Sequence, residues 1–457
     1  MKRILIVGGG ICGLAMAARL VESRAAEVTL VESDNRLGGK ILTIRDNTFT
    51  LEAGPDSFLT VKPAAYKLCE SLGLEDHLVD TRPENNCTYV VRRRKLHVLP
   101  GGMASFVPTE WGPFIRTGLL STRAKLRMAL EPFVPASNGR DPSIADFFSR
   151  RLGAETYQWL VEPLLAGIYA GRGASLGLRS TFPRFLDLER KHGSLFRASL
   201  SARMAPRPSR GMFQTLRYGL GEMIDALQAI VQPRAQVRLG VTAQAISLDE
   251  ATGRVRVALS DGEWKGDNVA LCIPTWAAAP LVAPLDTVLA RLLVGVRYSS
   301  TATVSMAFHT DEVKHPLNGY GFVVPRAEGR STLASTWTSQ KWPHRAPPEW
   351  RLLRAYLGGL EREAVLELDD DLLVEEALGD LRAILGTRLT PRRVWVHRWE
   401  RALPQYVPGH ADHVASIEAR AAVLNGRVVL AGSAYHGVGI PDCIADGHRV
   451  ADEFLKS

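Results

Sequence analysis

The chain begins with a pattern of apolar and glycine positions that predicts a β-strand, a tight turn and an α-helix. Residues 4–7 are all apolar, as in a strand buried on both faces. A G-x-G-x-x-G run occupies residues 8–13, and apolar residues then recur at helical spacing as far as Ala18. A second apolar run, 28–31, ends at Glu32. Together these segments predict a parallel βαβ unit.

Similar patterns predict the elements of the rest of the chain. Apolar runs on either side of a basic tip indicate a hairpin near 89–99, and residues 102–200 have mainly helical spacing. Within that segment, Asp141, Pro142 and Gly153 are expected to cap, begin and end one helix. Further expected elements are a helix near 218–230, strands near 236–239, 254–259, 269–273, 301–308 and 319–324, a helix at 370–385, a strand at 428–430 and a closing helix.

The order of these elements predicts an α/β fold class, with an α+β organisation overall. The tail repeats the strand, glycine turn and helix of the opening, so a Rossmann-like domain assembled from distant segments is expected. The expected parts are this discontinuous Rossmann-like domain (1–80, 211–275 and 396–457), a β-sheet substrate domain (81–101 and 276–395) and a helical insertion (102–210), a candidate lid or membrane-contacting domain.

The opening segment has the residue types that a dinucleotide site requires. Gly8 would form the turn, Gly10 would let the backbone approach a pyrophosphate, and Gly13 would let the helix pack on the strand. The helix N-terminus offers N–H groups and a partial positive charge to the anion. Glu32 would accept hydrogen bonds from a ribose diol. Because all these parts occur in order, an ordinary tight turn is the weaker explanation.

The segment after Glu32 favours FAD over NAD as the cofactor. Residues 33–40 read SDNRLGGK, which places an arginine and two glycines just past the expected ribose-binding acid. Small residues there let the chain run close to a pyrophosphate and ribityl chain, as in many FAD oxidoreductases. Simple NAD dehydrogenases usually lack such a segment. A glycine-rich hairpin without a ligand is the alternative.

Composition and charge narrow the class of protein. The chain has 457 residues, more than one core usually holds, and it is 46% hydrophobic and 23% charged, as in soluble globular proteins. Five cysteines without a C-x-x-C suggest neither a disulfide framework nor a zinc knuckle, and the H-x-x-H formed by His410 and His413 lacks a third ligand. No metal is therefore expected.

The net charge of +8 is informative about partners. The basic residues are mostly dispersed and are not interleaved with stacking aromatics, so a nucleic-acid partner is not expected. An acidic small molecule or an anionic membrane surface fits the charge better. No apolar stretch is long enough to span a bilayer. A cytoplasmic protein is expected, with peripheral contact at the inner face of the cell membrane left open.

Segments along nearly the whole chain resemble the oxygen-dependent porphyrinogen oxidases of haem biosynthesis. These belong to the amine-oxidase-like FAD superfamily, with a nucleotide domain of p-hydroxybenzoate-hydroxylase type. The end segment GVGIPDCI is most similar to the Gram-positive-type enzymes, which act mainly on coproporphyrinogen III. The segments that carry the resemblance are GGGICGLA, LVESDNRLGGK, GPDSFL, LVEPLLAGIYAG, STFPRF, ERKHGSL, WTSQKWPHRAP, RWERALPQY and GVGIPDCI.

This resemblance implies a set of flavin contacts. Residues 54–57 would pass near the flavin ring, Ala243 would touch the adenine through its backbone, and Trp399 would lie by the isoalloxazine. The N-terminus of the last helix would cover the pyrimidine edge, where it stabilises negative charge on reduced flavin. The full set is Gly8, Gly9, Gly10, Ile11, Cys12, Gly13, Glu32, Ser33, Arg36, Gly39, Lys40, Gly54, Pro55, Asp56, Ser57, Ala243, Trp399, Val438, Gly439 and Ile440.

On the substrate side, the resemblance implies that Gly167 and Ile168 line the tetrapyrrole cavity, with the Gly167 carbonyl facing pyrrole N–H groups. A contact between small helical residues is the alternative. Mitochondrial-type members hold a propionate with an arginine where this chain has residues 86–88 (NCT), so that contact is absent. Lys62 is a candidate replacement, and a solvated surface lysine explains it equally well.

The implied reaction is the six-electron oxidation of coproporphyrinogen III to coproporphyrin III, with protoporphyrinogen IX as an additional or the main substrate. Hydride would leave a meso carbon for flavin N5 in three rounds, with oxygen as acceptor, so no catalytic side chain is expected. The resemblance also implies hand-off of the product to a ferrochelatase. An amine oxidase or carotenoid desaturase on the same scaffold is the alternative enzyme.

Overall fold

The structure is a computed structural model that describes residues 1–104, 106–137, 139, 141–202, 211–249 and 252–456. The chain divides into two compact units, which are described separately. Unit 1 comprises Met1–Asp80, Arg210–Arg297 and Ala411–Ser457, and unit 2 comprises Thr81–Ser209 and Tyr298–His410. Unit 1 therefore draws on both ends and the middle of the chain. The expected domain boundaries differ from these limits at 276–297 and 396–410, and their functional assignment stays a prediction.

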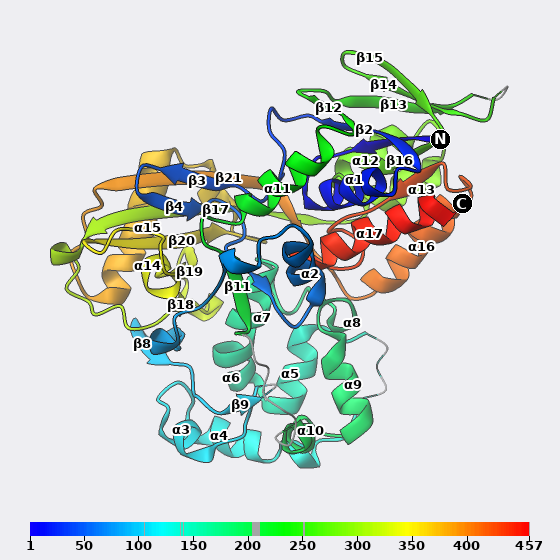
Figure 1. Cartoon of the computed structure of the whole chain (residues 1–457). Helices are drawn as coiled ribbons and strands as arrows, with labels where there is room; N and C mark the ends of the chain where they lie inside the picture. The colour runs from blue at the N-terminus through cyan, green and yellow to red at the C-terminus, as the bar shows by residue number, and fades with distance from the viewer. Residues whose placement is uncertain (105, 138, 140, 203–210, 250–251, 457) are drawn as a thin grey trace. The chain divides into compact units, whose positions relative to one another are not determined.

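A parallel sheet forms the centre of unit 1 and confirms the expected α/β class (Figure 1). Its strand order is β12-β2-β1-β16-β22, and every neighbouring pair is parallel. Residues 4–7 of the first strand are at most 5% exposed, since helices and loops cover both faces. The bounds are β1 Lys2–Val7, β2 Ala26–Glu32, β12 Gln236–Leu239, β16 Asn268–Leu271 and β22 Val428–Leu430.

Helix α1 (Ile11–Ser23) packs against both α11 (Gly221–Val231) and α17 (Ile440–Lys456), as Figure 1 shows. A Cβ on Gly447 of α17 would lie 2.4 Å from the Cys12 carbonyl oxygen, so glycine allows this close approach. Helices from the beginning, middle and end of unit 1 thus share one hydrophobic core.

Smaller elements complete unit 1. Strands β3 (Thr43–Asp46) and β4 (Phe49–Glu52) form a hairpin, and β13 (Ala243–Leu248), β14 (Val255–Leu259) and β15 (Gly262–Gly266) form an antiparallel sheet. The remaining elements are β5 (Phe58–Leu59), α2 (Pro63–Ser71), β6 (Leu78–Asp80), β11 (Phe213–Leu216), α12 (Thr275–Val282), α13 (Thr287–Val294) and α16 (His410–Ala422), the last of which starts at the final residue of unit 2.

Unit 2 contains a mixed sheet of order β21-β17-β20-β19-β18-β7-β8. The expected hairpin and helix are confirmed: Arg93 and Arg94 turn the chain with positive φ, and the apolar face of 370–385 is largely buried. The bounds are β7 Tyr89–Arg92, β8 Lys95–Val98, β17 Tyr298–His309, β18 Gly321–Val323, β19 Thr332–Thr336, α14 Thr338–Lys341, β20 Trp350–Gly358, α15 Asp370–Leu385 and β21 Arg393–Pro404.

The other part of unit 2 is mainly helical, as expected for 102–200. Its elements are β9 (Met103–Ala104), β10 (Val107–Pro108), α3 (Trp111–Arg116), α4 (Thr122–Ala129), η3 (Glu131–Phe133), α5 (Ile144–Leu152), α6 (Ala154–Thr156), the π-helical turn η4 (Tyr157–Val161), α7 (Glu162–Ile168), α8 (Leu178–Thr181), α9 (Pro183–His192) and α10 (Leu195–Ala202).

The expected cap of α5 was wrong. Ser143 caps the helix by accepting a hydrogen bond from the Asp146 amide at 3.0 Å. The Asp141 carboxylate instead accepts from the amides of Arg179 and Gly409, at 2.9 and 2.7 Å. Both of these partners lie far along the chain, so the sequence around the helix gives no sign of them.

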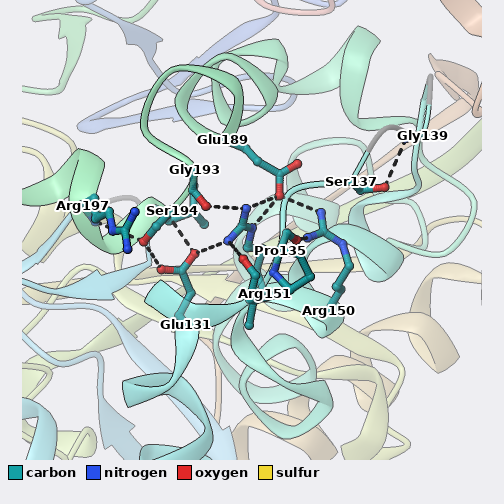
Figure 2. A network of polar contacts seen from close by, with 12 residues as sticks. Glu131, Pro135, Ser137, Gly139, Arg150, Arg151, Glu189, Gly193, Ser194 and Arg197 are labelled. Atoms are coloured by element: carbon teal, nitrogen blue, oxygen red, sulfur yellow. Dashed lines mark hydrogen bonds and ion pairs between the residues drawn. The ribbon is translucent and has the colours of Figure 1, made fainter.

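A buried ion network holds the helical part of unit 2 together. Figure 2 shows the Arg151 guanidinium between the carboxylates of Glu131 and Glu189. Arg151 and Glu131 are fully buried. The Glu131 carboxylate also accepts from the Ser194 hydroxyl and from the Leu195 amide, the latter at 2.9 Å. The network therefore links η3, α5, the end of α9 and the start of α10.

Candidate functional site

The three glycines of the opening motif meet different surroundings. Gly8 has φ of +107°, and a Cβ there would lie 2.7 Å from the Cys272 carbonyl oxygen. A Cβ on Gly13 would lie 2.0 Å from the Gly8 carbonyl oxygen, so helix and strand approach as closely as backbone allows. A Cβ on Gly10, by contrast, would meet no atom of the described chain within 4 Å. The backbone at Gly10 thus faces open space at the start of α1, where an anion can approach.

Glu32 lies at the end of β2, beside these glycines. Its carboxylate accepts hydrogen bonds from the amides of Gly9 and Asp34, at 2.7 and 2.9 Å, and from the Ser33 hydroxyl at 3.1 Å. The Val241 amide donates to the Glu32 carbonyl at 2.9 Å, so the segment leading to Ala243 lies next to this acid. The structure thereby brings the expected ribose and adenine contacts together.

Arg36 shapes the loop between Glu32 and Lys40. Its guanidinium donates to the carbonyls of Leu37 and Gly39, at 3.2 and 2.6 Å, and so wraps its own loop. The Gly38 amide donates to the Gly9 carbonyl at 2.8 Å, which joins the loop to the glycine turn. A Cβ on Gly39 would lie 3.1 Å from the Gly10 Cα. Small residues are therefore needed where the loop passes the start of α1.

Lys40 is a half-buried cation beside this loop. Burial lowers the pKa of its ammonium group, and the nearby Cys443 thiol partly offsets that effect. Within the described chain, no carboxylate forms an ion pair with Lys40. Burial of an ammonium group without an anion is unfavourable, so this position is suited to an anionic ligand. The neighbouring Cys443 thiol is itself buried, which raises its pKa to about 12.

The start of α17 contains the next group of expected contacts. Val438 and Gly439 immediately precede the helix, and Ile440 is its first residue. The Asp442 carboxylate accepts from the Gly439 amide at 3.2 Å and pairs with the Lys62 ammonium at 2.7 Å. Lys62 is therefore an ion-pair partner of the helix start and not a solitary surface lysine.

The remaining expected residues lie in both units. Gly54, Pro55, Asp56 and Ser57 follow β4 in unit 1 and are half-buried, with the Ser57 hydroxyl donating to the Asp56 carboxylate at 2.8 Å. Ile11 and Cys12 are buried in the first turn of α1. In unit 2, Trp399 is half-buried on β21, and its ring centroid lies 4.4 Å from that of His397.

Gly167 and Ile168 end α7 of unit 2 and are both exposed. A Cβ on Gly167 would meet nothing within 4 Å in the described structure, and its carbonyl accepts from the Ala170 amide at 3.2 Å. The preceding π-helical turn, 157–161, shifts the register of α7. Of the segment 166–171 (AGIYAG), Gly167 and Ile168 form an exposed part, whereas Tyr169, Ala170 and Gly171 are buried.

Two features of the site were not predicted from the sequence. One is the Lys62–Asp442 pair, because its partners are separated by most of the chain. The other is a set of arginines around the 166–171 segment, of which only Arg172 is its neighbour in the sequence. Among the described residues, no group of three or more His, Cys, Asp or Glu side chains is arranged to hold a metal ion. The same residues contain no helix long and apolar enough to cross a membrane.

Comparison with known proteins shows which family this chain resembles along its length. The sequence profile of the flavin-containing amine oxidoreductases matches residues 11–455. The coproporphyrinogen III oxidase of Bacillus subtilis (strain 168) is 36% identical, covering 99% of this chain and 98% of its own. That of Propionibacterium freudenreichii is 33% identical, covering 99% and 91%. A crystal structure from Exiguobacterium sp. 255-15, named as a candidate protoporphyrinogen oxidase, superposes with a TM-score of 0.89 at 34% identity, covering 100% and 99%.

Proposed function

The chain belongs to the family of flavin-containing amine oxidoreductases, and from this premise we propose that it is an FAD-dependent oxidase of coproporphyrinogen III. The product is coproporphyrin III, and oxygen is the electron acceptor. The observation that carries the proposal is the near-complete match to coproporphyrinogen III oxidases, over both chains. Protoporphyrinogen IX is the second candidate substrate, since one similar structure bears that enzyme's name.

FAD is the form of flavin that fits unit 1. The open face of Gly10 and the uncapped start of α1 suit a pyrophosphate, and Lys40 supplies a half-buried cation for it. Glu32 suits the diol of an adenosine ribose, which riboflavin phosphate lacks. The residues proposed to hold FAD are Gly8, Gly9, Gly10, Ile11, Cys12, Gly13, Glu32, Ser33, Arg36, Gly39, Lys40, Gly54, Pro55, Asp56, Ser57, Ala243, Trp399, Val438, Gly439 and Ile440.

When bound, FAD supplies the acceptor for hydride leaving a meso carbon of the porphyrinogen, and oxygen then takes the electrons. The chain's own residues would bind the cofactor and the substrate and orient them toward each other. The first amides of α17 offer partial positive charge near Val438 and Gly439. We propose that no side chain is an essential acid or base. An alanine scan that found a cavity residue whose loss abolishes turnover, with substrate binding intact, would contradict this.

On the substrate side, we propose that the 166–171 segment, with Gly167 and Ile168, lines the tetrapyrrole site. The exposure of both residues leaves their surface accessible to a ligand. Lys62 is the proposed contact for one propionate. Its ion pair with Asp442 keeps the ammonium at the start of α17, and half of the Lys62 side chain remains exposed.

We also propose that the helical part of unit 2 contacts an anionic membrane surface. Four large apolar side chains, here called the apolar patch, are strongly exposed: Ile115 (61%), Leu126 (64%), Leu130 (56%) and Phe133 (81%). Arg116 on α3 and Arg123 on α4 are also exposed. Exposed apolar side chains next to basic ones are suited to contact with anionic lipid. We propose that the protein is located in the cytoplasm, at the inner face of the cell membrane. Its product, coproporphyrin III, would pass there to a ferrochelatase.

The buried ion network fixes the short turn that contains two side chains of the apolar patch. Glu131 is buried between two exposed neighbours, Leu130 and Phe133, on one short turn. Its contacts with Arg151 and Ser194, which Figure 2 shows, fix that turn. Leu130 and Phe133 on the same turn are exposed.

The function is tested by anaerobic mixing of the flavin-loaded protein with each porphyrinogen. We expect coproporphyrinogen III to bleach the flavin, and porphyrin fluorescence to appear after oxygen is admitted. Faster bleaching by protoporphyrinogen IX would reverse the substrate preference. Bleaching by a polyamine, with both porphyrinogens inert, would favour the amine oxidase alternative and overturn the proposal.

A further inference from the structure

Three arginines meet at the end of the 166–171 segment of unit 2, although they are distant in the sequence. Arg172 follows the segment directly, Arg326 lies between β18 and β19, and Arg362 follows β20. One terminal nitrogen of Arg326 donates to the carbonyls of Gly171 and Leu360, at 3.3 and 2.7 Å. The Leu360 amide donates to the Ala170 carbonyl at 2.8 Å. The arginines are thus anchored directly to the segment proposed to line the substrate.

The arginines also contact one another through the backbone. Arg362 donates from its two terminal nitrogens to the carbonyls of Arg330 and Arg326, at 2.9 and 3.2 Å. Arg330 forms its own pair with Asp380 at 2.7 Å, which neutralises both groups. Arg172, Arg326 and Arg362 are therefore the cations whose charge has to be balanced by other anionic groups.

Two carboxylates face these three cations. Glu361 pairs with Arg172 at 2.8 Å, and both side chains are largely exposed. Glu162 accepts from the Tyr157 hydroxyl at 3.0 Å and acts electrostatically on Arg326. Burial raises the pKa of Tyr157, so its hydroxyl stays a neutral donor and adds no charge. One positive charge is left over around the end of the segment.

Arg326 has unused donor nitrogens although its side chain is half-buried. Burial lowers its pKa, and the proximity of Arg172 lowers it further against the opposing effect of Glu162. Burial and the neighbouring Arg326 likewise lower the pKa of Arg362. Two of the three Arg326 nitrogens, Nε and Nη1, donate to no residue in the part of the chain that is described. Each of these two nitrogens has an N–H free to give a carboxylate oxygen a charge-assisted hydrogen bond.

We propose that Arg326, together with Arg172 and Arg362, forms a carboxylate-binding subsite that takes one propionate of the substrate. This deepens the proposed function and rests on it, since the proposed substrate carries four propionates. A structural clamp on backbone carbonyls is the alternative role of Arg326, and the test separates the two.

The test compares Arg326→Gln and Arg326→Lys with a matched control, Arg392→Gln. Arg392 is an exposed arginine of unit 2 that pairs with Glu312 away from the segment. Steady-state kinetics with coproporphyrinogen III would give KM and kcat. Fluorescence quenching by the product coproporphyrin III, at low and high salt, would give Kd without turnover.

For a carboxylate subsite, Arg326→Gln raises both KM and Kd by about tenfold or more, because a charge-assisted hydrogen bond is lost. We expect kcat and flavin content to change little, Arg326→Lys to recover part of the affinity, and Arg392→Gln to match the unaltered protein. Unchanged KM and Kd would overturn the proposal. A fall in kcat with unchanged Kd would instead assign Arg326 a clamping role.

A second variant and the Kd series distinguish a failure of the subsite from misfolding and from a failure of the proposed function. If Arg326→Gln does not fold, Arg172→Gln provides the test, because that side chain is at the surface and, among the described residues, donates hydrogen bonds to Glu361 alone. It must raise Kd for coproporphyrin III in the same direction, and no change would overturn the subsite. If the unaltered protein does not oxidise coproporphyrinogen III, the proposed function fails, while the Kd series still reports on the arginines.

Discussion

At the scale of single residues, two glycines of the opening motif have different roles in the structure, one in packing and one in leaving space. Gly13 is needed for packing inside the protein, whereas Gly10 leaves space for something outside it. The structure shows the close packing that the motif predicts at Gly13, whereas the approach of a pyrophosphate to Gly10 stays a prediction. The spacing could not show which side of the backbone would be open, because that depends on Leu37, Gly38 and Cys272 from elsewhere in unit 1.

The two glycines give opposite predictions for stability. Gly13→Ala places a methyl group 2.0 Å from the Gly8 carbonyl oxygen and is expected to lower the free energy of unfolding by about 1–3 kcal/mol. Gly10→Ala meets open space at an ordinary φ of −70°, so stability is expected to stay within about 0.5 kcal/mol while flavin is lost. Denaturant unfolding and bound-flavin absorbance check both. A Gly10→Ala protein that retains full flavin would contradict the assigned site.

Lys40 gives a prediction that depends on pH. Its ammonium group has a lower pKa in the folded than in the unfolded chain, so the unfolded chain binds more protons at alkaline pH. The free energy of unfolding therefore contains a term that increases as pH rises from the lowered pKa toward the ordinary value of about 10.5. Lys40→Met removes this term. The difference between the two flavin-free proteins, measured by urea unfolding across pH, isolates it from the titrating thiols.

The same variant should weaken cofactor binding. Without the Lys40 ammonium the anionic part of FAD loses a half-buried cation, and we expect the Kd for FAD to rise about tenfold. Fluorescence titration of the flavin-free protein measures this. An Arg24→Met variant, altered at a surface arginine just after α1, is the control and should bind FAD normally.

At the scale of helices and strands, patterned segments were predicted well and long-range polar contacts were not. The helix at 370–385 shows a clear apolar period and a capping aspartate, and the structure gives those bounds. The cap of α5 was misplaced because Asp141 looks like a cap in its local sequence but bonds to Arg179 and Gly409. Glu131, Arg151 and Glu189 have no spacing that relates them, so their network could not be predicted.

That network is expected to be strongly stabilising for the helical part of unit 2. Arg151→Met leaves two carboxylates without their shared cation, in surroundings where Glu131 is fully buried, and should cost about 3–5 kcal/mol. Arg190→Met is the control, since its pair with Asp187 is about 70% exposed on both sides and contributes about 0–1 kcal/mol. Chemical denaturation followed by circular dichroism measures both. Equal losses would refute the role given to the network.

At the scale of the whole molecule, the sequence predicted the family and the participation of distant segments in one compact unit. Resemblance along the chain identified the enzyme class, because the matching segments occur in order from residue 8 to 444. Surfaces and charge clusters were less predictable. Arg172, Arg326 and Arg362 become neighbours only when β18, β20 and α7 are placed by the fold.

The apolar patch gives a prediction about partners. The double substitution Leu130→Ser and Phe133→Ser should abolish sedimentation with anionic phosphatidylglycerol vesicles, because two of the four exposed apolar side chains of the patch are removed. Catalysis in detergent-free buffer should be unaffected. Val294→Ser, altered at a similarly exposed residue of unit 1, is the control. Equal vesicle binding by the double variant would exclude this surface as the contact.

The packing of α17 on α1 also determines when the proposed cofactor site can form during synthesis. A ribosome makes the glycine turn first and the helix that covers it long afterwards, so the growing chain must carry an unfinished nucleotide fold through most of translation. Flavin capture is consequently a late event in biogenesis. Partial products that stop before Ile440 should leave the ribosome colourless and rely on chaperones.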